Sequence, residues 1–227
     1  MTATFDDAVE FISKVGLAYL FGSKRATEFP NLHMQLTGHD SIDDWGPETE
    51  VVWECRAELP LRGAAWFGEW LRKRGTFVSV GLLPAALGWC GRAADVEEDV
   101  SQAWGISPDA GMVYEAVLAE GPIASMALRR AVGLEKSESA KAFQNALKSL
   151  QHGLFVTTFG HEQESGAWAS SVYEPTVRAF PDVQILDQTA GLHELVSCLR
   201  EQADDPSPRL AATLFRAPVE LVREVWD

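Results

Sequence analysis

The clearest pattern of apolar and polar positions lies in residues 107–176. Ser107 and Pro108 supply an N-cap and a first-turn proline for a helix, and Gly121 marks its end. A second, shorter helix is expected over residues 125–132, followed by a turn. This half of the segment therefore predicts two helices joined at a tight connection.

The third helix of this segment, expected over residues 140–151, separates an apolar face from a polar one. The apolar face recurs at helical spacing and comprises Phe143, Ala146, Leu147 and Leu150. The polar face has the same spacing and comprises Lys141, Gln144, Asn145 and Lys148. Two apolar strands, residues 154–159 and 167–173, follow around a polar tip. Three helices and a β-hairpin in this order predict a winged helix-turn-helix module.

The first part of the chain alternates short helices with short apolar segments. Residues 4–15 have helical spacing, and residues 17–21 read as a short strand or turn. Pro30 is expected to begin another helix, and the acidic residues 38–49 to form an exposed loop. A mainly helical N-terminal unit is therefore predicted.

Two further helices are expected over residues 50–58 and 62–73, the second with its aromatic side chains on one side. An apolar stretch, residues 76–89, comes next, and the acidic run 95–99 reads as a solvated connection. These elements complete the N-terminal unit.

The tail, residues 187–227, predicts two short helices separated by a proline-containing break. The fold class expected overall is mainly α with small β-hairpins, built from tandem winged helix-turn-helix-like units. The expected division is an N-terminal unit over residues 1–105, the winged helix over 106–177 and a helical extension over 178–227.

Composition places the chain among globular proteins. It has 227 residues, of which 46% are hydrophobic and 23% charged. Residues 1–10 lack the basic and apolar runs of a signal peptide, and no apolar stretch reaches the length of a membrane span. Cys55, Cys90 and Cys198 are odd in number and far apart, which favours free thiols over disulfides. We expect a cytoplasmic protein without a membrane partner.

The formal net charge of −14 restricts how the chain can contact nucleic acid, because phosphate binding then needs a local basic patch. Two groups of residues are candidates. The first is a basic run with one preceding arginine: Arg62, Arg72, Lys73 and Arg74. The second is the polar face of the third helix: Lys141, Gln144, Asn145 and Lys148. Side chains of these types contact phosphates and base edges.

Each group also has a purely structural interpretation. The basic run can cap the end of the expected helix over residues 62–73, with Trp66 and Trp70 in the core rather than stacked on a base. Any amphipathic helix needs a polar face. The expected hairpin tip carries Glu162 and Glu164 and no Lys or Arg, so phosphates would repel it. An acidic winged helix is also typical of a protein-interaction module.

Several short segments carry a family pattern. They are Ala8-Val9-Glu10-Phe11-Ile12, Phe29-Pro30-Asn31-Leu32, Arg62-Gly63-Ala64-Ala65-Trp66-Phe67-Gly68-Glu69, Leu71-Arg72-Lys73-Arg74-Gly75-Thr76, Leu82-Leu83-Pro84, Tyr114-Glu115-Ala116-Val117-Leu118 and Leu128-Arg129-Arg130-Ala131. The first and the last of these segments resemble the AlkZ-type alkyl-DNA glycosylases. The others resemble the AlkZ-related family, a shorter group related to those glycosylases, and this is the closer resemblance. The resemblance runs from about residue 5 to residue 181.

The resemblance also implies something about activity. Glycosylases of the AlkZ type use a Gln-x-Gln or Gln-x-Asp motif just after their first helix, because a polar pair must position water and stabilise charge on the sugar. In this chain Tyr19 and Phe21 stand at those two positions. The resemblance therefore implies a relative without the catalytic pair, and no catalytic residue is expected.

No other motif for chemistry stands out. The five histidines have no partner at a recurring metal-ligand spacing, and no phosphate loop or nucleophile elbow is present. We expect no metal and no cofactor. Three functional classes stay open: a non-catalytic DNA-associated protein, which the sequence favours, a scaffold that binds a protein partner or forms a homodimer, and a divergent DNA glycosylase with its catalytic pair elsewhere.

Overall fold

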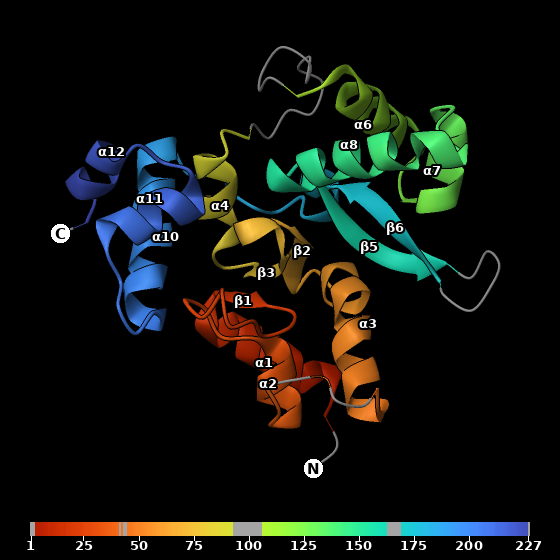
Figure 1. The fold of residues 1–227 in the computed structure, drawn as a ribbon. Helices are drawn as coiled ribbons and strands as arrows, with labels where there is room; N and C mark the ends of the chain where they lie inside the picture. Colours follow the sequence, from red (N-terminus) through yellow and green to blue (C-terminus); the bar gives the residue numbers. More distant parts are fainter. Residues whose placement is uncertain (1–2, 41, 43–44, 93–105, 163–168, 227) are drawn as a thin grey trace.

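The computed structural model describes residues 3–40, 42, 45–92, 106–162 and 169–226 (Figure 1). Over these residues the chain is mainly helical, with two small antiparallel sheets of three strands each. The expected fold class of helices with small β-elements is therefore confirmed. No helix in the described part of the chain is long and apolar enough to cross a membrane.

Four elements open the chain: α1 (Phe5–Val15), β1 (Leu17–Tyr19), α2 (Leu32–Thr37) and α3 (Pro47–Leu61). A capping box begins α1, since the Thr4 hydroxyl accepts from the Asp7 N–H and the Asp7 carboxylate accepts from the Thr4 N–H. Gly16 ends α1 with a φ of 76°, a conformation that favours glycine. The second helix begins after Asn31, whose side chain caps it, and not at Pro30 as expected.

The prediction of a helix over residues 62–73 is wrong. In its place come β2 (Ala65–Glu69), the 3₁₀ turn η1 (Leu71–Lys73) and β3 (Gly75–Ser79), followed by α4 (Leu83–Trp89). The strand order in this sheet is β1-β3-β2. Trp66 and Phe67 are adjacent on β2 and belong to different apolar clusters, one on each face of the sheet. Because both faces are covered, β2 lacks an alternating pattern, and a run of this kind cannot be told from a buried helix by periodicity.

The elements of the second unit occur in the expected order. They are α6 (Pro108–Glu120), β4 (Ile123–Ala124), α7 (Ser125–Ala131), the 3₁₀ turn η2 (Ser137–Ser139), α8 (Ala140–His152), β5 (Val156–Glu162) and β6 (Ser170–Pro175). The hairpin gains an unexpected third strand, because β4 pairs with β6. Residues 163–166 of the expected hairpin tip, residues 167–168 of the expected second strand and the acidic run 95–99 lie outside the described residues.

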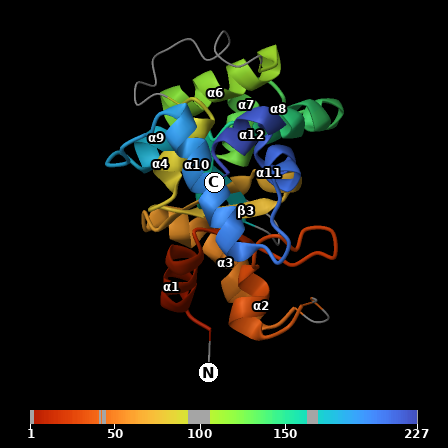
Figure 2. The ribbon, with the colours of Figure 1, turned by 90° about the vertical axis from the view of Figure 1, so that its left-hand side faces the viewer.

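The tail continues with α9 (Thr176–Ala179), α10 (Gln188–Gln202), α11 (Pro208–Phe215) and α12 (Val219–Glu224). Three helices thus follow residue 187 instead of the expected two, since Arg216 takes a left-handed conformation that ends α11. Helix α10 packs against α4 (Figure 2). This contact requires glycine at residue 191, where a Cβ atom would lie 2.5 Å from the Ala85 carbonyl oxygen.

The first sheet is the junction of the molecule. One apolar cluster joins this sheet and α4 to α10, α11 and α12, and another joins its opposite face to α1 and α3. The edge strand β2 is tied to β5 by the Thr157 hydroxyl, which lies 3.1 Å from both the N–H and the carbonyl oxygen of Phe67. The indole N–H of Trp66 donates to the Thr176 hydroxyl at 3.1 Å. Parts of the chain far apart in sequence therefore meet along β2.

Candidate functional site

The basic run lies in the turn between β2 and β3. The Trp70 N–H donates to the Arg74 carbonyl oxygen at 3.1 Å, and Arg72 and Lys73 between them have φ values of 51° and 58°. Residues other than glycine, asparagine and aspartate rarely adopt this conformation, and such strain often marks functional positions. The turn leaves the Arg72 and Lys73 side chains exposed.

Arg72 is held by a buried carboxylate. Its Nε–H donates to Glu28 Oε1 at 2.7 Å, and the Tyr19 hydroxyl donates to the same oxygen at 2.5 Å. Only 7% of Glu28 is exposed. Burial and the neighbouring carboxylate raise the pKa of Tyr19, whereas the hydrogen bond to Glu28 raises the pKa of Arg72. Arg72 therefore neutralises an acid inside the fold.

Arg74 also contributes to the fold. Its Nη2 donates to the carbonyl oxygens of Phe21 and Gly22 at 3.3 and 3.2 Å, and the guanidinium lies 5.8 Å from the Tyr19 ring centre. Its Nε atom is buried without a hydrogen-bond partner among the described residues. Arg74 therefore binds the backbone after β1 and leaves one buried donor unpaired.

A pocket of about 410 Å³ opens next to this turn. Its walls come from the segment after β1, from α3, from the β2–β3 turn, from the end of α8 and from the β5–β6 hairpin. Helix α3 lies beside β5 (Figure 1). Its lining includes six aromatic or cationic side chains: Phe21, Trp53, Arg56, Lys73, Arg74 and Tyr173. We call this space the junction pocket.

The aromatic side of the junction pocket was not predicted. Phe21 and Trp53 stack with their ring centres 6.3 Å apart and their planes at 18°. Arg56 lies over the Trp53 ring at 4.1 Å and donates to the Ser171 hydroxyl at 2.8 Å. Burial lowers the pKa of Arg56, and its Nε atom is buried without a partner among the described residues. The spacing of Trp53 and Arg56 on α3, i and i+3, was the available signal.

Helix α8 meets the junction pocket only at its C-terminal end. Lys148 pairs with Glu69 at 3.3 Å, and the Gln151 side-chain oxygen accepts from the Glu69 N–H at 3.2 Å. Glu69 and Gln151 both line the junction pocket. The other predicted residues of the polar face are exposed along the helix and do not line it: Lys141, Gln144 and Asn145.

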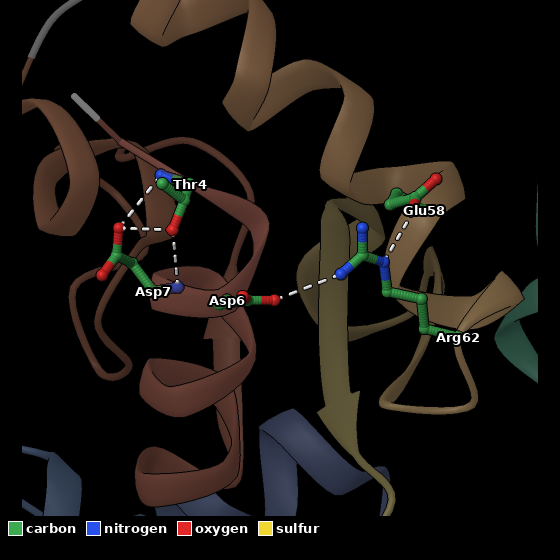
Figure 3. A network of polar contacts seen from close by, with 5 residues as sticks. All are labelled: Thr4, Asp6, Asp7, Glu58 and Arg62. Atoms are coloured by element: carbon green, nitrogen blue, oxygen red, sulfur yellow. Dashed lines mark hydrogen bonds and ion pairs between the residues drawn. The ribbon is translucent and has the colours of Figure 1, made fainter.

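Arg62 lies apart from the basic run in its contacts. Its Nε–H donates to Glu58 at 2.6 Å and its Nη1 pairs with Asp6 at 3.2 Å, so it ties the end of α3 to the start of α1 (Figure 3). It does not line the junction pocket. The structure thus brings together Lys73, Arg74 and the end of α8, and leaves Arg62 elsewhere.

No cluster of three His, Cys, Asp or Glu side chains suited to a metal occurs among the described residues. Burial raises the pKa of Cys55 and Cys198 to about 12, so both thiols stay protonated at neutral pH.

Tyr19 and Phe21, at the two positions of the implied glycosylase motif, have different surroundings. Tyr19 is buried and bonded to Glu28, whereas Phe21 lines the junction pocket. A family model described as AlkZ related matches residues 2–215 of the chain. No curated protein and no solved structure matches the chain.

Proposed function

Because this chain belongs to the AlkZ-related family, which relates it to AlkZ-type DNA repair proteins, we propose that it is a non-catalytic protein that binds DNA through the junction pocket. The observation that carries this proposal is the pairing of aromatic and cationic side chains around one opening. Aromatic faces stack on bases, and cations beside them contact the backbone phosphates.

The pocket offers both kinds of contact at a suitable size. A volume of about 410 Å³ lies in the range of small-ligand sites and accommodates a nucleobase. Phe21 and Trp53 form an aromatic wall, and Lys73 is an exposed cation at the opening. Basic side chains gathered here supply the local patch that a chain of net charge −14 needs for phosphate contact.

We further interpret the second unit as a winged helix, with α8 as its third helix and β5 and β6 as the wing. The hairpin contributes Tyr173 to the junction pocket, and α8 contributes Gln151. Lys148 on the polar face of α8 reaches Glu69 at the same place. In this arrangement the C-terminal end of the third helix and the basic run belong to one contact surface.

The protein is proposed to be non-catalytic because Tyr19 and Phe21 stand at the two positions of the glycosylase motif. The Tyr19 hydroxyl is engaged with buried Glu28, and Phe21 offers only an apolar ring to the pocket. Neither side chain can hold water as an amide or carboxylate does. The protein is therefore proposed to recognise DNA without cleaving the bond between base and sugar.

Fluorescence anisotropy with duplex, single-stranded and alkylated DNA at two salt concentrations tests this proposal. The variant Lys73→Glu removes an exposed cation of the junction pocket, whereas Lys141→Glu changes the distant end of α8. Arg223→Glu, at an exposed residue of α12, is the matched control with the same change of charge. Arg72 and Arg74 are left unchanged because the fold uses both.

We expect salt-sensitive binding that Lys73→Glu weakens and Arg223→Glu preserves. Loss in Lys141→Glu alone would move the contact surface to the exposed face of α8 and contradict the pocket assignment. No binding at the lower salt would refute DNA association and favour a protein-interaction module. Release of a base from alkylated DNA would refute the non-catalytic part of the proposal.

A further inference from the structure

His152, the last residue of α8, is influenced by three cations, of which one lies on α8 and two come from distant parts of the sequence. Its Nδ1 atom is 2.8 Å from Arg216 Nη2. The charges of Arg216, Lys73 and Lys148 all act on the His152 ring and oppose its protonation, after burial, which is the largest influence on its pKa. One of the three cations therefore contacts the imidazole directly, and the two lysines act on it through their charge.

The fold holds these cations near one another. The turn η1, which carries Lys73, contacts both α8 and α11. Arg216 follows α11 directly, and Lys148 lies one turn before His152 on α8. Lys73 and Arg216 both have left-handed backbone conformations, with φ of 58° and 53°. This backbone costs energy for residues with a side chain, so the packing of the surrounding elements must maintain it.

The hydrogen bonding at His152 fixes its proton. A guanidinium only donates, so His152 Nδ1 must accept from Arg216 and carries no proton. The ring proton then resides on Nε2, which is buried without a hydrogen-bond partner among the described residues. The group thus presents one oriented guanidinium and two ammonium groups, all of which are donors.

The positive charges of this group exceed the negative charges paired with them, which favours binding of an anion. Glu69, 3.3 Å from Lys148, is the one acid that forms an ion pair with any of these cations among the described residues. Lys73 and Arg216 are exposed, and 46% of the Lys148 side chain is exposed, so an anion can reach them from solvent. A guanidinium with free donors binds phosphate through two parallel hydrogen bonds, and ammonium groups add charge.

We propose that Lys73, Lys148 and Arg216 form a binding site for a phosphate group, in which His152 positions the Arg216 guanidinium. The inference rests on the proposed function, since Lys73 also lines the junction pocket and would place a backbone phosphate beside it. Free phosphate has the same chemistry and is the other possible source. The site assigns a binding role to the C-terminal tail, which contributes Arg216.

The substitution Arg216→Asn tests the site with little disturbance of the backbone, because asparagine tolerates the left-handed conformation. Arg223→Asn on α12 is the control, and thermal unfolding of both variants checks that the fold persists. If the site holds a backbone phosphate, the slope of log K against log salt for duplex DNA becomes shallower by about 0.9 in Arg216→Asn alone. A variant that is only destabilised would not change this slope.

Titration with inorganic phosphate, followed by NMR of the His152 ring, is the second arm. Saturable shifts in the wild type that Arg216→Asn abolishes support the site, even if no DNA binds and the proposed function fails. DNA binding with an unchanged slope, together with a His152 ring that does not respond to phosphate, overturns the site and leaves the proposed function standing. Lack of response in both arms overturns both.

Discussion

Arg72 donates to Glu28 at 2.7 Å, and through this ion pair the first residue of the basic run neutralises a buried carboxylate of the fold. The carboxylate is buried, whereas 35% of the Arg72 side chain is exposed. The pair shows that a basic run read from sequence contains residues with different roles. Lys73, the next residue, has no such partner in the described part of the chain and lines the junction pocket.

Arg72→Gln should destabilise the protein, because it leaves the buried Glu28 carboxylate without its cation. We expect a loss of about 1–3 kcal/mol in the free energy of unfolding, the cost of an unsatisfied buried acceptor reduced by partial exposure of the pair. Chemical denaturation measures it. Adding Glu28→Gln should recover part of the loss, and Lys24→Gln, an exposed residue nearby, should be neutral. Equal stability of Arg72→Gln and wild type would contradict the role of the pair.

Gly191→Ala should disrupt the packing of α10 on α4. The added Cβ would lie 2.5 Å from the Ala85 carbonyl oxygen, and backbone must move to relieve the contact. A loss of about 1–3 kcal/mol in the free energy of unfolding is expected from such overpacking. Gly81→Ala is the matched control, since only the Ser79 hydroxyl lies near its added Cβ, at 3.9 Å. A similar melting temperature for both variants would argue against a close helix contact.

His152 should make stability depend on pH below neutrality. Burial and the charges of Arg216, Lys73 and Lys148 lower its pKa from 6.5 to about 4. Between these values the unfolded chain binds a proton that the folded chain does not, so stability falls as pH falls from 6.5 towards 4.

Comparison with His152→Asn isolates this contribution, because carboxylates elsewhere titrate in both proteins. The difference in unfolding free energy between wild type and variant should shrink as the pH is lowered over that range. A difference that stays constant with pH would show that the imidazole keeps its ordinary pKa in the folded protein.

Trp53→Leu should weaken binding of single-stranded DNA by removing an aromatic face of the junction pocket. Loss of one stacked base costs about 1–3 kcal/mol, which corresponds to roughly a 5- to 150-fold rise in Kd. Anisotropy with an intact oligonucleotide and one made of abasic units separates stacking from charge. The abasic strand should bind both proteins alike, and an equal loss for both strands would exclude stacking by Trp53.

Local sequence patterns predicted most of the helices, because caps and apolar spacing act within a few residues. The helical spacing of residues 4–15, the Ser107 N-cap and the two-faced pattern of α8 each identify their helix. The β2 strand escaped prediction because it is covered on both faces, and that cover comes from residues distant in the chain. Burial on two sides is a property of the assembled molecule.

The candidate site divides in the same way. The sequence identified Lys73 and Arg74 as part of a basic run and Lys148 as part of the polar face of a helix. It did not identify their partners or show which of these cations lie together. Trp53, Arg56 and Tyr173 reach the junction pocket only because α3 and β6 meet the β2–β3 turn in space. Arg216 reaches His152 by the packing of the tail.

The sequence by itself determined most of the helical elements, the order of the second unit and the family, because these depend on short-range patterns and on recurring motifs. The tertiary structure alone decided that residues 65–69 form a strand, that Arg72 neutralises Glu28, and that cations from three segments gather around His152. The physical reason is that burial, ion pairing and like-charge proximity act between residues many positions apart. A local sequence pattern cannot predict such contacts.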